Sequence, residues 1–340
     1  LQHVMRVSEK ANCDSIAVVA GNGIEQVKKV VSEENQNFQV FEQTERLGTG
    51  HAVLAAREVL EQSPDDILVL FGDTPLLKEE TLIDMRETLS KGAAIVVLGF
   101  YAKDPAGYGR LLEENDKLIA IREDAEASEE ERSVNFCNGG IMGFSGQHML
   151  ELLDAIENNN AKGEYYLTDA VEIANQKGLK VVAIEASEEE VIGVNTRLGL
   201  AEVEKLWQKA AREKFMSSGV SMQAPETIFL NADTEIETDV VLEPNIVFGP
   251  GVKICSGAHI RAFSYIEGAI VGESAVVGPY ARLRPGAEMG ANTKVGNFVE
   301  IKNAKIHESA KVNHLTYVGD ADVGYQNTDY DLPKLTESYA

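Results

Sequence analysis

Apolar residues recur every six positions over much of the second half of the chain, with two steps of five. The fifteen positions are Ile236, Leu242, Phe248, Ile254, Ile260, Ile266, Val271, Val277, Leu283, Met289, Val295, Ile301, Ile306, Val312 and Val318. An ordinary antiparallel domain alternates with a period of two and has loops of variable length, so it does not explain a period of six held this long. The pattern is typical of a parallel β-helix in which these side chains point inward.

The first half of the chain follows a different pattern, in which amphipathic helices alternate with short apolar strands. The expected strands span residues 15–20, 38–41, 67–71, 93–100, 109–112, 117–123, 137–142 and 180–186. The expected helices lie near residues 1–8, 25–32, 50–62, 78–90, 126–132, 169–176 and 196–215. Such alternation predicts an α/β fold with a doubly wound, mostly parallel sheet.

The strand expected at residues 67–71 is followed by a glycine and Asp73. Its apolar side chains are continuous rather than alternating, which predicts burial on both faces. Pro75 prevents the strand from continuing, so the Asp73 carboxylate is displayed where open α/β sheets bind ligands, and it would suit a divalent metal ion. The same residue could equally cap the next helix or close a turn. Gly48 and Gly50, at the start of the helix expected near residues 50–62, also allow two interpretations. The turn that they form could present backbone N–H groups to an anion, or it could only lead the chain into the helix.

Composition excludes several classes of protein. A chain of 340 residues with 44% hydrophobic residues exceeds one typical domain, so two domains are expected. The formal net charge of −24, with no basic block, argues against binding to nucleic acid or to a membrane surface. The three cysteines, Cys13, Cys137 and Cys255, have neither metal nor redox spacing. Together with the lack of a recognisable signal peptide or membrane span, they indicate a cytoplasmic protein.

Six motifs of the first half occur in a specific order: LGTGHA (residues 47–52), FGDTPL (71–76), GYGR (107–110), NGG (138–140), GEYYLTD (163–169) and GVN (193–195). Together they resemble the pyrophosphorylase domain of the bacterial bifunctional N-acetylglucosamine-1-phosphate uridyltransferase/glucosamine-1-phosphate acetyltransferase family. Phe71 stands where that family often has Tyr. The resemblance implies uridylyl transfer from UTP to N-acetylglucosamine-1-phosphate, with release of pyrophosphate.

The resemblance also implies roles for individual residues of this domain. Asp73 and Asn195 would hold Mg²⁺, which prefers oxygen ligands such as a carboxylate and an amide. The other expected substrate-binding residues of the uridyltransferase site are Gln43, Gly48 and Thr49 at the uracil, Gly109, Glu123 and Asn138 at the N-acetylglucosamine, and Phe71, Gly72, Tyr166 and Thr168 nearby. Two anions meet in this reaction, so a metal ion and fixed donors must neutralise charge, while little covalent work falls to the protein.

Three motifs within the period of six resemble the acetyltransferase half of the same family: RLRPGA (282–287), GNFVEIK (296–302) and NHLTYVGD (313–320). His314 matches the catalytic base that takes a proton from the 2-amine of glucosamine-1-phosphate before its attack on acetyl-CoA, and imidazole titrates in the range that this step needs. Arg284, Lys302 and Tyr317 match the residues that hold that sugar phosphate. The family implies a left-handed β-helix with three hexads per coil, hence about five coils, and a homotrimer with sites between neighbouring prisms.

The resemblance sets the expected domains. We expect a pyrophosphorylase domain at residues 1–197, a linker helix at 198–225, a β-helix at 226–324 and a non-repeat tail at 325–340. The chain has no initiator Met, and the family's first strand and glycine-rich nucleotide loop would precede Leu1. Beyond Val318 the next positions of the series are Gly324, Tyr330 and Thr336, so we expect the final coils to be missing. We therefore expect this chain alone to show little of either activity.

Two other functions remain open from the sequence. One is a monofunctional sugar-1-phosphate nucleotidylyltransferase whose β-helix only supports oligomerisation or regulation, although the four matched acetyltransferase residues argue against it. The other is an inactive, truncated chain that folds and binds sugar phosphates without turnover.

Overall fold

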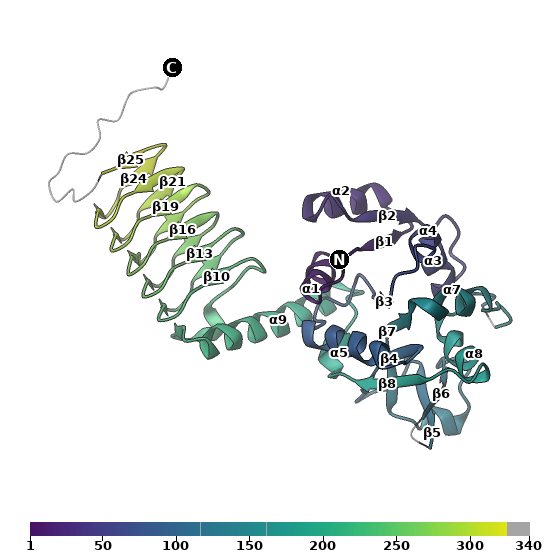
Figure 1. The fold of residues 1–340 in the computed structure, drawn as a ribbon. Helices are drawn as coiled ribbons and strands as arrows, with labels where there is room; N and C mark the ends of the chain where they lie inside the picture. Colours follow the sequence, from purple (N-terminus) through teal and green to yellow (C-terminus); the bar gives the residue numbers. More distant parts are fainter. Residues whose placement is uncertain (116, 161, 325–340) are drawn as a thin grey trace. The chain divides into compact units, whose positions relative to one another are not determined.

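The computed structural model describes residues 1–115, 117–160 and 162–324, and the tail expected at 325–340 lies outside these ranges. The chain divides after Val203 into two units, one built around a mixed sheet and the other around three parallel sheets (Figure 1). Helix α9, Arg197–Ser217, crosses that division. None of the described helices is long and apolar enough to span a lipid bilayer.

Six strands form the main sheet of the first unit: β3 Asp66–Val69, β4 Ile95–Tyr101, β5 Arg110–Glu114, β6 Lys117–Arg122, β7 Phe136–Ser145 and β8 Val181–Glu185. Their order is β6-β5-β7-β4-β8, and β3 pairs with β7. Strand β7 runs antiparallel to β3, β4 and β5, whereas β4 and β8 are parallel to each other. Strands β3, β4, β5 and β8 therefore point in one direction, while β6 and β7 point the other way. Among the described strands of this sheet, the β4–β8 pairing is parallel and the other four pairings are antiparallel.

The two faces of this sheet carry separate apolar cores, because side chains alternate along each strand. The helices of this unit are α1 Gln2–Lys10, α2 Ile24–Glu34, α3 Thr49–Leu54, α4 Arg57–Leu60, α5 Glu79–Ser90, α6 Glu129–Arg132, α7 Gly146–Asp154 and α8 Ala170–Gln176. From β4, Ile95 and Val97 belong to the core that includes residues of α7 and α8. Val96 and Leu98 belong to the core that includes residues of α5. Helices that cover both faces confirm the doubly wound α/β fold.

A two-stranded parallel sheet, β1 Ala17–Ala20 with β2 Gln39–Glu42, is separate from the main sheet. Among the described strands, β1 pairs only with β2, and β3 pairs only with β7. Residues of β1 and β3 line a common cavity of about 900 Å³. The expectation that the strand before Asp73 is buried on both faces is therefore wrong: all residues of β3 are half-buried, because one edge of the strand opens onto this cavity.

The second unit is a parallel β-helix whose coils are stacked in Figure 1 from β10 to β25. One sheet contains β10 Glu235–Ile236, β13 Lys253–Ile254, β16 Ala269–Val271, β19 Ala287–Met289, β22 Ala304–Ile306 and β25 Asp322–Val323. The second contains β9 Ser221–Met222, β11 Val241–Leu242, β14 His259–Ile260, β17 Val276–Val277, β20 Lys294–Val295 and β23 Lys311–Val312. The third contains β12 Val247–Phe248, β15 Tyr265–Ile266, β18 Arg282–Leu283, β21 Glu300–Lys302 and β24 Tyr317–Gly319.

Each strand of the β-helix pairs in parallel with the strand one coil away. Of the fifteen positions of the six-residue series, fourteen are buried, and Val318 is partly buried against the same core. This confirms the predicted hexapeptide register. One expectation is wrong, because the series does not stop at Val318. A further step of five places Val323 in register with Ile306 and against the core, like the earlier steps of five after Ile266 and Ile301.

Candidate functional sites

Asp73 lies exposed in the turn that follows β3, and the loop before α9 lies beside it. Val194 N–H donates to the Asp73 carbonyl at 2.9 Å. A Cβ placed on Gly193 would lie 3.5 Å from Asp73 Oδ2 and 3.8 Å from Asn195 Nδ2. These two atoms are therefore no farther apart than the sum of the two distances, about 7.3 Å. The two side chains expected to share a metal ion are neighbours in space, although they lie far apart in the sequence.

The donor set fits a hard divalent cation that keeps part of its water shell. Asp73 offers carboxylate oxygens and Asn195 an amide oxygen, both of the type that Mg²⁺ prefers. Within the described residues, no group of three or more His, Cys, Asp or Glu side chains is placed to hold a metal ion. Mg²⁺ is commonly bound by one or two carboxylates together with substrate phosphates, so a full protein cage is not required.

The loop that contains Gly48 is held by backbone hydrogen bonds to Tyr165. Gly50 N–H donates to the Tyr165 carbonyl at 2.8 Å, and Tyr165 N–H donates to the Leu47 carbonyl at 2.7 Å. Gln43 Nε2 donates to the Gly48 carbonyl at 3.2 Å. A Cβ on Gly48 would lie 2.6 Å from the Tyr165 carbonyl oxygen, and φ is +108° there. The fold itself therefore requires glycine at this position.

Further hydrogen bonds connect this loop to the residues expected near the sugar nucleotide. Thr49 Oγ1 accepts from Leu167 N–H at 3.0 Å. In the next residue, the buried Thr168 hydroxyl donates to Glu123 Oε1 at 3.2 Å. Tyr166 lies on the same segment, and its pKa is raised first by burial and then by nearby carboxylates. Residues of two motifs, LGTGHA and GEYYLTD, thus meet each other and Glu123, which directly follows β6.

Asn138 connects Gly109, another residue expected at the N-acetylglucosamine, to the turn that carries Asp73. Its N–H donates to the Gly109 carbonyl at 2.8 Å, and its Oδ1 accepts from Gly140 N–H at 3.0 Å. The Phe71 ring lies against Gly140, since a Cβ at that glycine would be 2.3 Å from Phe71 Cε2. Phe71 is separated from Asp73 by Gly72 alone. The residues expected at the uridyltransferase site therefore form a connected set in the first unit.

A group of carboxylates surrounds Glu123, one of the residues expected to bind the sugar. Asp169, at the end of the 3₁₀ helix η1 (Leu167–Asp169), has a pKa raised from 3.8 to about 6, first by burial and then by Glu172, Glu126 and Glu123. Arg122 opposes this rise. Carboxylates accept hydrogen bonds from hydroxyl groups and repel phosphates. This side of the site is suited to a neutral sugar ring rather than to a second anion.

Arg110 and Asp124 are two residues of this region that sequence motifs did not single out as site residues. The Arg110 guanidinium is 2% exposed, pairs with Asp124 at 3.0 Å and donates to the Tyr108 carbonyl. Its Nε is buried and has no hydrogen-bond partner, which is true of no other side-chain nitrogen or oxygen atom among the described residues. The ion pair ties β5 to the residue after Glu123, and Arg110 itself follows Gly109. It therefore holds two expected sugar-binding residues in place.

Three of the four expected acetyltransferase residues lie on one sheet of the β-helix. Lys302 and Tyr317 belong to the adjacent strands β21 and β24, and Arg284 directly follows β18. Arg284 and Lys302 follow the fully buried Leu283 and Ile301, and Tyr317 precedes Val318, which is partly buried against the same core, so the three side chains point outward on successive coils. Arg284 Nη1 donates to Glu300 Oε1 at 2.8 Å, and Glu300 is in register with Tyr317. Glu300 is a neighbour of this set that sequence reasoning missed.

The fourth residue, His314, is exposed in the turn before β24. The Thr316 hydroxyl donates to its carbonyl at 3.2 Å. Within the part of the chain that the structure describes, no hydrogen bond or ion pair joins the His314 imidazole to Arg284, Lys302 or Tyr317. The imidazole is thus placed on the same coil as Tyr317 and is accessible to a ligand.

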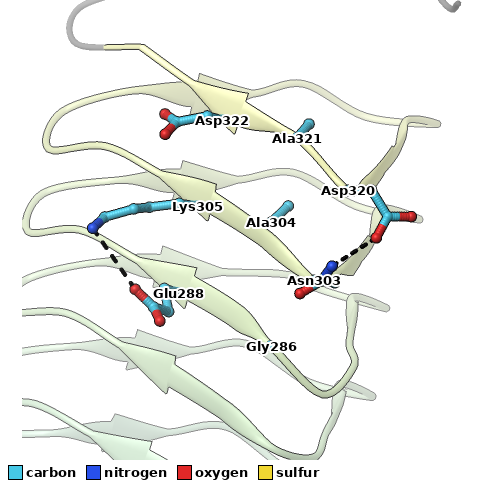
Figure 2. A pocket seen from close by; sticks show the side chains of 8 residues that line it. All are labelled: Gly286, Glu288, Asn303, Ala304, Lys305, Asp320, Ala321 and Asp322. Atoms are coloured by element: carbon cyan, nitrogen blue, oxygen red, sulfur yellow. Dashed lines mark hydrogen bonds and ion pairs between the residues drawn. The ribbon is translucent and has the colours of Figure 1, made fainter.

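A hollow of about 480 Å³ lies on the neighbouring sheet, along β19, β22 and β25 (Figure 2). Its lining residues are Gly286, Glu288, Asn303, Ala304, Lys305, Asp320, Ala321 and Asp322. Asn303 donates to Asp320 at 2.6 Å, and Lys305 Nζ lies 3.9 Å from Glu288 (Figure 2). None of the expected acetyltransferase residues lines this hollow, so it is separate from the face that carries Arg284 and Lys302.

Comparison with known proteins places these observations in a family. Residues 1–134 match the family described as MobA-like NTP transferase domain. Residues 268–303 match the family described as bacterial transferase hexapeptide (six repeats). The two matches fall in the two units that the structure separates.

Several curated proteins are similar to most of the chain. The bifunctional protein GlmU of Bartonella quintana (strain Toulouse) is 52% identical over 337 residues, which cover 99% of this chain and 75% of that protein. The protein of the same name from Azorhizobium caulinodans is 53% identical over 339 residues, covering 100% and 75%. That of Chelativorans sp. (strain BNC1) is 55% identical over 235 residues, covering 69% and 52%. The matched part thus spans from about half to three quarters of the length of these relatives.

Proposed function

Because this chain belongs to the family of bifunctional GlmU proteins, we propose that it carries two sites for UDP-N-acetylglucosamine synthesis. One site transfers an acetyl group from acetyl-CoA to glucosamine-1-phosphate. The other transfers uridylyl from UTP to N-acetylglucosamine-1-phosphate and releases pyrophosphate. The observation that carries the proposal is that the residues expected for each reaction gather in separate units of the fold.

At the uridyltransferase site, an oxygen of the sugar phosphate attacks the α-phosphate of UTP as the bond to pyrophosphate breaks. Mg²⁺ held by Asp73 and Asn195 would supply positive charge opposite the phosphates. Thr49 binds the uracil side, and Glu123 and Asn138 bind the sugar, so that the attacking and leaving oxygens are aligned. No side chain needs to form a covalent bond to the substrate.

At the acetyltransferase site, Arg284 and Lys302 bind the phosphate of glucosamine-1-phosphate, and the Tyr317 hydroxyl adds a hydrogen bond. An ammonium group is not a nucleophile, so His314 takes the proton that the 2-amine must lose. The amine nitrogen then forms a bond to the thioester carbonyl carbon as the carbon–sulfur bond breaks. Coenzyme A leaves as the thiol after it takes up a proton.

We also propose how the chain is organised around these reactions. Residues 1–197 carry uridylyl transfer, residues 226–324 carry acetyl transfer, and residues 198–225 link them. The protein acts in the cytoplasm as a homotrimer, and the exposed position of His314 supports an assembly in which a neighbouring prism completes the acetyltransferase site.

Calorimetric titration of the chain with two ligands tests the proposal. UDP-N-acetylglucosamine should bind with an affinity that falls about tenfold in Glu123→Gln, because a charged acceptor for sugar hydroxyls is lost. Glu129 is exposed on α6 and is not one of the carboxylates around Asp169, so Glu129→Gln is the matched control and should bind normally. Glucosamine-1-phosphate should bind about tenfold more weakly to Lys302→Ala but normally to Lys305→Ala.

The two ligands should be affected by different substitutions. Glu123→Gln should leave glucosamine-1-phosphate binding unchanged, and Lys302→Ala should leave UDP-N-acetylglucosamine binding unchanged. A chain that binds neither ligand, or variants that lose both ligands together, would overturn the assignment of two separate sites.

A further inference from the structure

Glu190 is a buried carboxylate outside the motifs that indicated the site. It lies in the 3₁₀ helix η2, Glu188–Val191, and is 5% exposed. No other Asp or Glu among the described residues is buried. A buried charge is costly unless it is paired and hydrogen-bonded, so its surroundings must compensate for it.

Three side chains satisfy this carboxylate. Lys78 Nζ lies 2.8 Å from Glu190 Oε1, Thr81 Oγ1 donates to Oε2 at 2.6 Å, and Ser187 Oγ donates to Oε1 at 3.1 Å. Burial raises the pKa of Glu190, but the hydrogen bonds from Lys78 and Thr81 lower it by more, so it lies below its usual value. Glu190 is therefore held as a charged acceptor.

These contacts join the two segments that carry the expected metal ligands. Lys78 and Thr81 belong to the start of α5, shortly after Asp73, whereas Glu190 lies shortly before Asn195. The same two segments meet again nearer to the ligands, where Val194 N–H donates to the Asp73 carbonyl at 2.9 Å.

The other side of η2 is packed tightly against β7. A Cβ on Gly139 would lie 2.8 Å from Val191 Cγ1 and 3.0 Å from the Leu98 carbonyl oxygen. Helix η2 therefore packs against β7 through Val191 and binds the start of α5 through the Glu190 carboxylate.

We propose that Glu190 is a positioning residue for the divalent-cation site formed by Asp73 and Asn195. Its carboxylate fixes the loop of Asn195 against the start of α5, and so sets the separation of the two ligands. This inference rests on the proposed cation site, and Glu190 itself need touch neither the cation nor the substrate. Groups that hold metal ligands in place typically contribute about 10- to 100-fold to metal affinity.

Titration with Mn²⁺ alone, followed by the electron paramagnetic resonance signal of the free ion, tests the inference without any activity measurement. The parent chain should bind Mn²⁺, and Asp73→Asn should abolish binding. Glu190→Gln keeps the size of the side chain and an acceptor for Thr81, but it loses the charge that attracts Lys78. We expect it to bind Mn²⁺ about tenfold more weakly, with the fold retained by circular dichroism.

Two further variants separate positioning from general stability. Lys78→Met removes the same ion pair but keeps the Glu190 carboxylate, which then has only Thr81 and Ser187 as side-chain donors; with the fold checked by circular dichroism, it should also weaken Mn²⁺ binding about tenfold. Glu188→Gln is the matched control, because Glu188 lies on the same 3₁₀ helix but pairs with Lys103 instead, and it should bind Mn²⁺ like the parent.

The outcomes distinguish this inference from the proposed function. Normal Mn²⁺ binding by both Glu190→Gln and Lys78→Met would overturn the role of Glu190 while leaving the cation site intact. Equal weakening in Glu188→Gln would show a general loss of structure and would also overturn it. A parent chain that binds no Mn²⁺, or binds it as well after Asp73→Asn, would overturn the cation site and the role of Glu190 with it.

Discussion

Gly48→Ala is the substitution whose cost the structure defines most closely. Gly48 has φ +108° and ψ 178°, a region essentially restricted to glycine, so alanine there is strained by about 1–3 kcal/mol. Its Cβ would lie 2.6 Å from the carbonyl oxygen of Tyr165 and 2.8 Å from the nitrogen, which are backbone atoms that cannot rotate away. Moving Tyr165 weakens its hydrogen bonds with Leu47 and Gly50, at about 1 kcal/mol each. We expect a total loss of about 3–5 kcal/mol.

Gly92→Ala is the matched control for this prediction. Gly92 has φ +91°, but no atom lies within 4 Å of the position of its Cβ, so alanine there is strained without a clash. We expect it to cost about 1–2 kcal/mol. Urea unfolding followed by far-ultraviolet circular dichroism measures both variants, since that signal reports mainly on helices and most helices belong to the first unit. If Gly48→Ala is no less stable than Gly92→Ala, the Tyr165 backbone does not constrain this loop and the reasoning fails.

Three further substitutions test other parts of the structure by urea or thermal unfolding. Ile254→Ala leaves a cavity at a fully buried position of the β-helix and should lower the free energy of unfolding by about 2–4 kcal/mol. Lys253→Ala, on the outer face, should lower it by less than about 0.5 kcal/mol, and equal losses would contradict the register. Asp124→Asn leaves the buried Arg110 guanidinium without its anionic partner and should cost up to about 3 kcal/mol, and an unchanged stability would refute the pairing. The pKa of Asp169 is raised by burial from 3.8 to about 6, so the folded state holds this proton more tightly than the unfolded state and loses stability as the pH rises through that interval. Asp169→Asn should therefore stabilise the protein by roughly 1 kcal/mol above pH 6, after discounting for the half-exposed carboxyl, with no gain near pH 4; a gain independent of pH would contradict this.

Most of the β-helix could be predicted from the sequence, because each coil obeys the same local rule. The inward position of Ile254 and that of Val277 follow from one period, and the structure confirms both. The end of the series was missed for the same reason. A step of five to Val323 looks like the failure of a period of six until the pairing of β25 with β22 is seen.

The first unit was less predictable, because its details depend on contacts between distant segments. Alternation of helices and strands indicated the α/β fold, but it did not reveal that β7 runs against its three neighbours or that α7 follows it. The burial of β3 depends on which strand lies at its free edge, and an apolar run such as 67–70 carries no information about that partner.

The candidate sites show the same division. Sequence motifs indicated Asp73 and Asn195, which the fold brings close together. Glu190 was missed because the three consecutive glutamates 188–190 look alike in the sequence, and only packing decides that the last of them is buried. Arg110 was missed because its burial depends on the pairing of β5 with β6 and β7.

The most direct test of two separate sites in one chain is a crystal structure of this chain grown with both UDP-N-acetylglucosamine and glucosamine-1-phosphate. We predict the sugar nucleotide beside Glu123, Asn138 and Asn195, and the sugar phosphate beside Arg284 and Lys302. Density for both ligands in one unit, or for either ligand against residues outside these sets, would contradict the account.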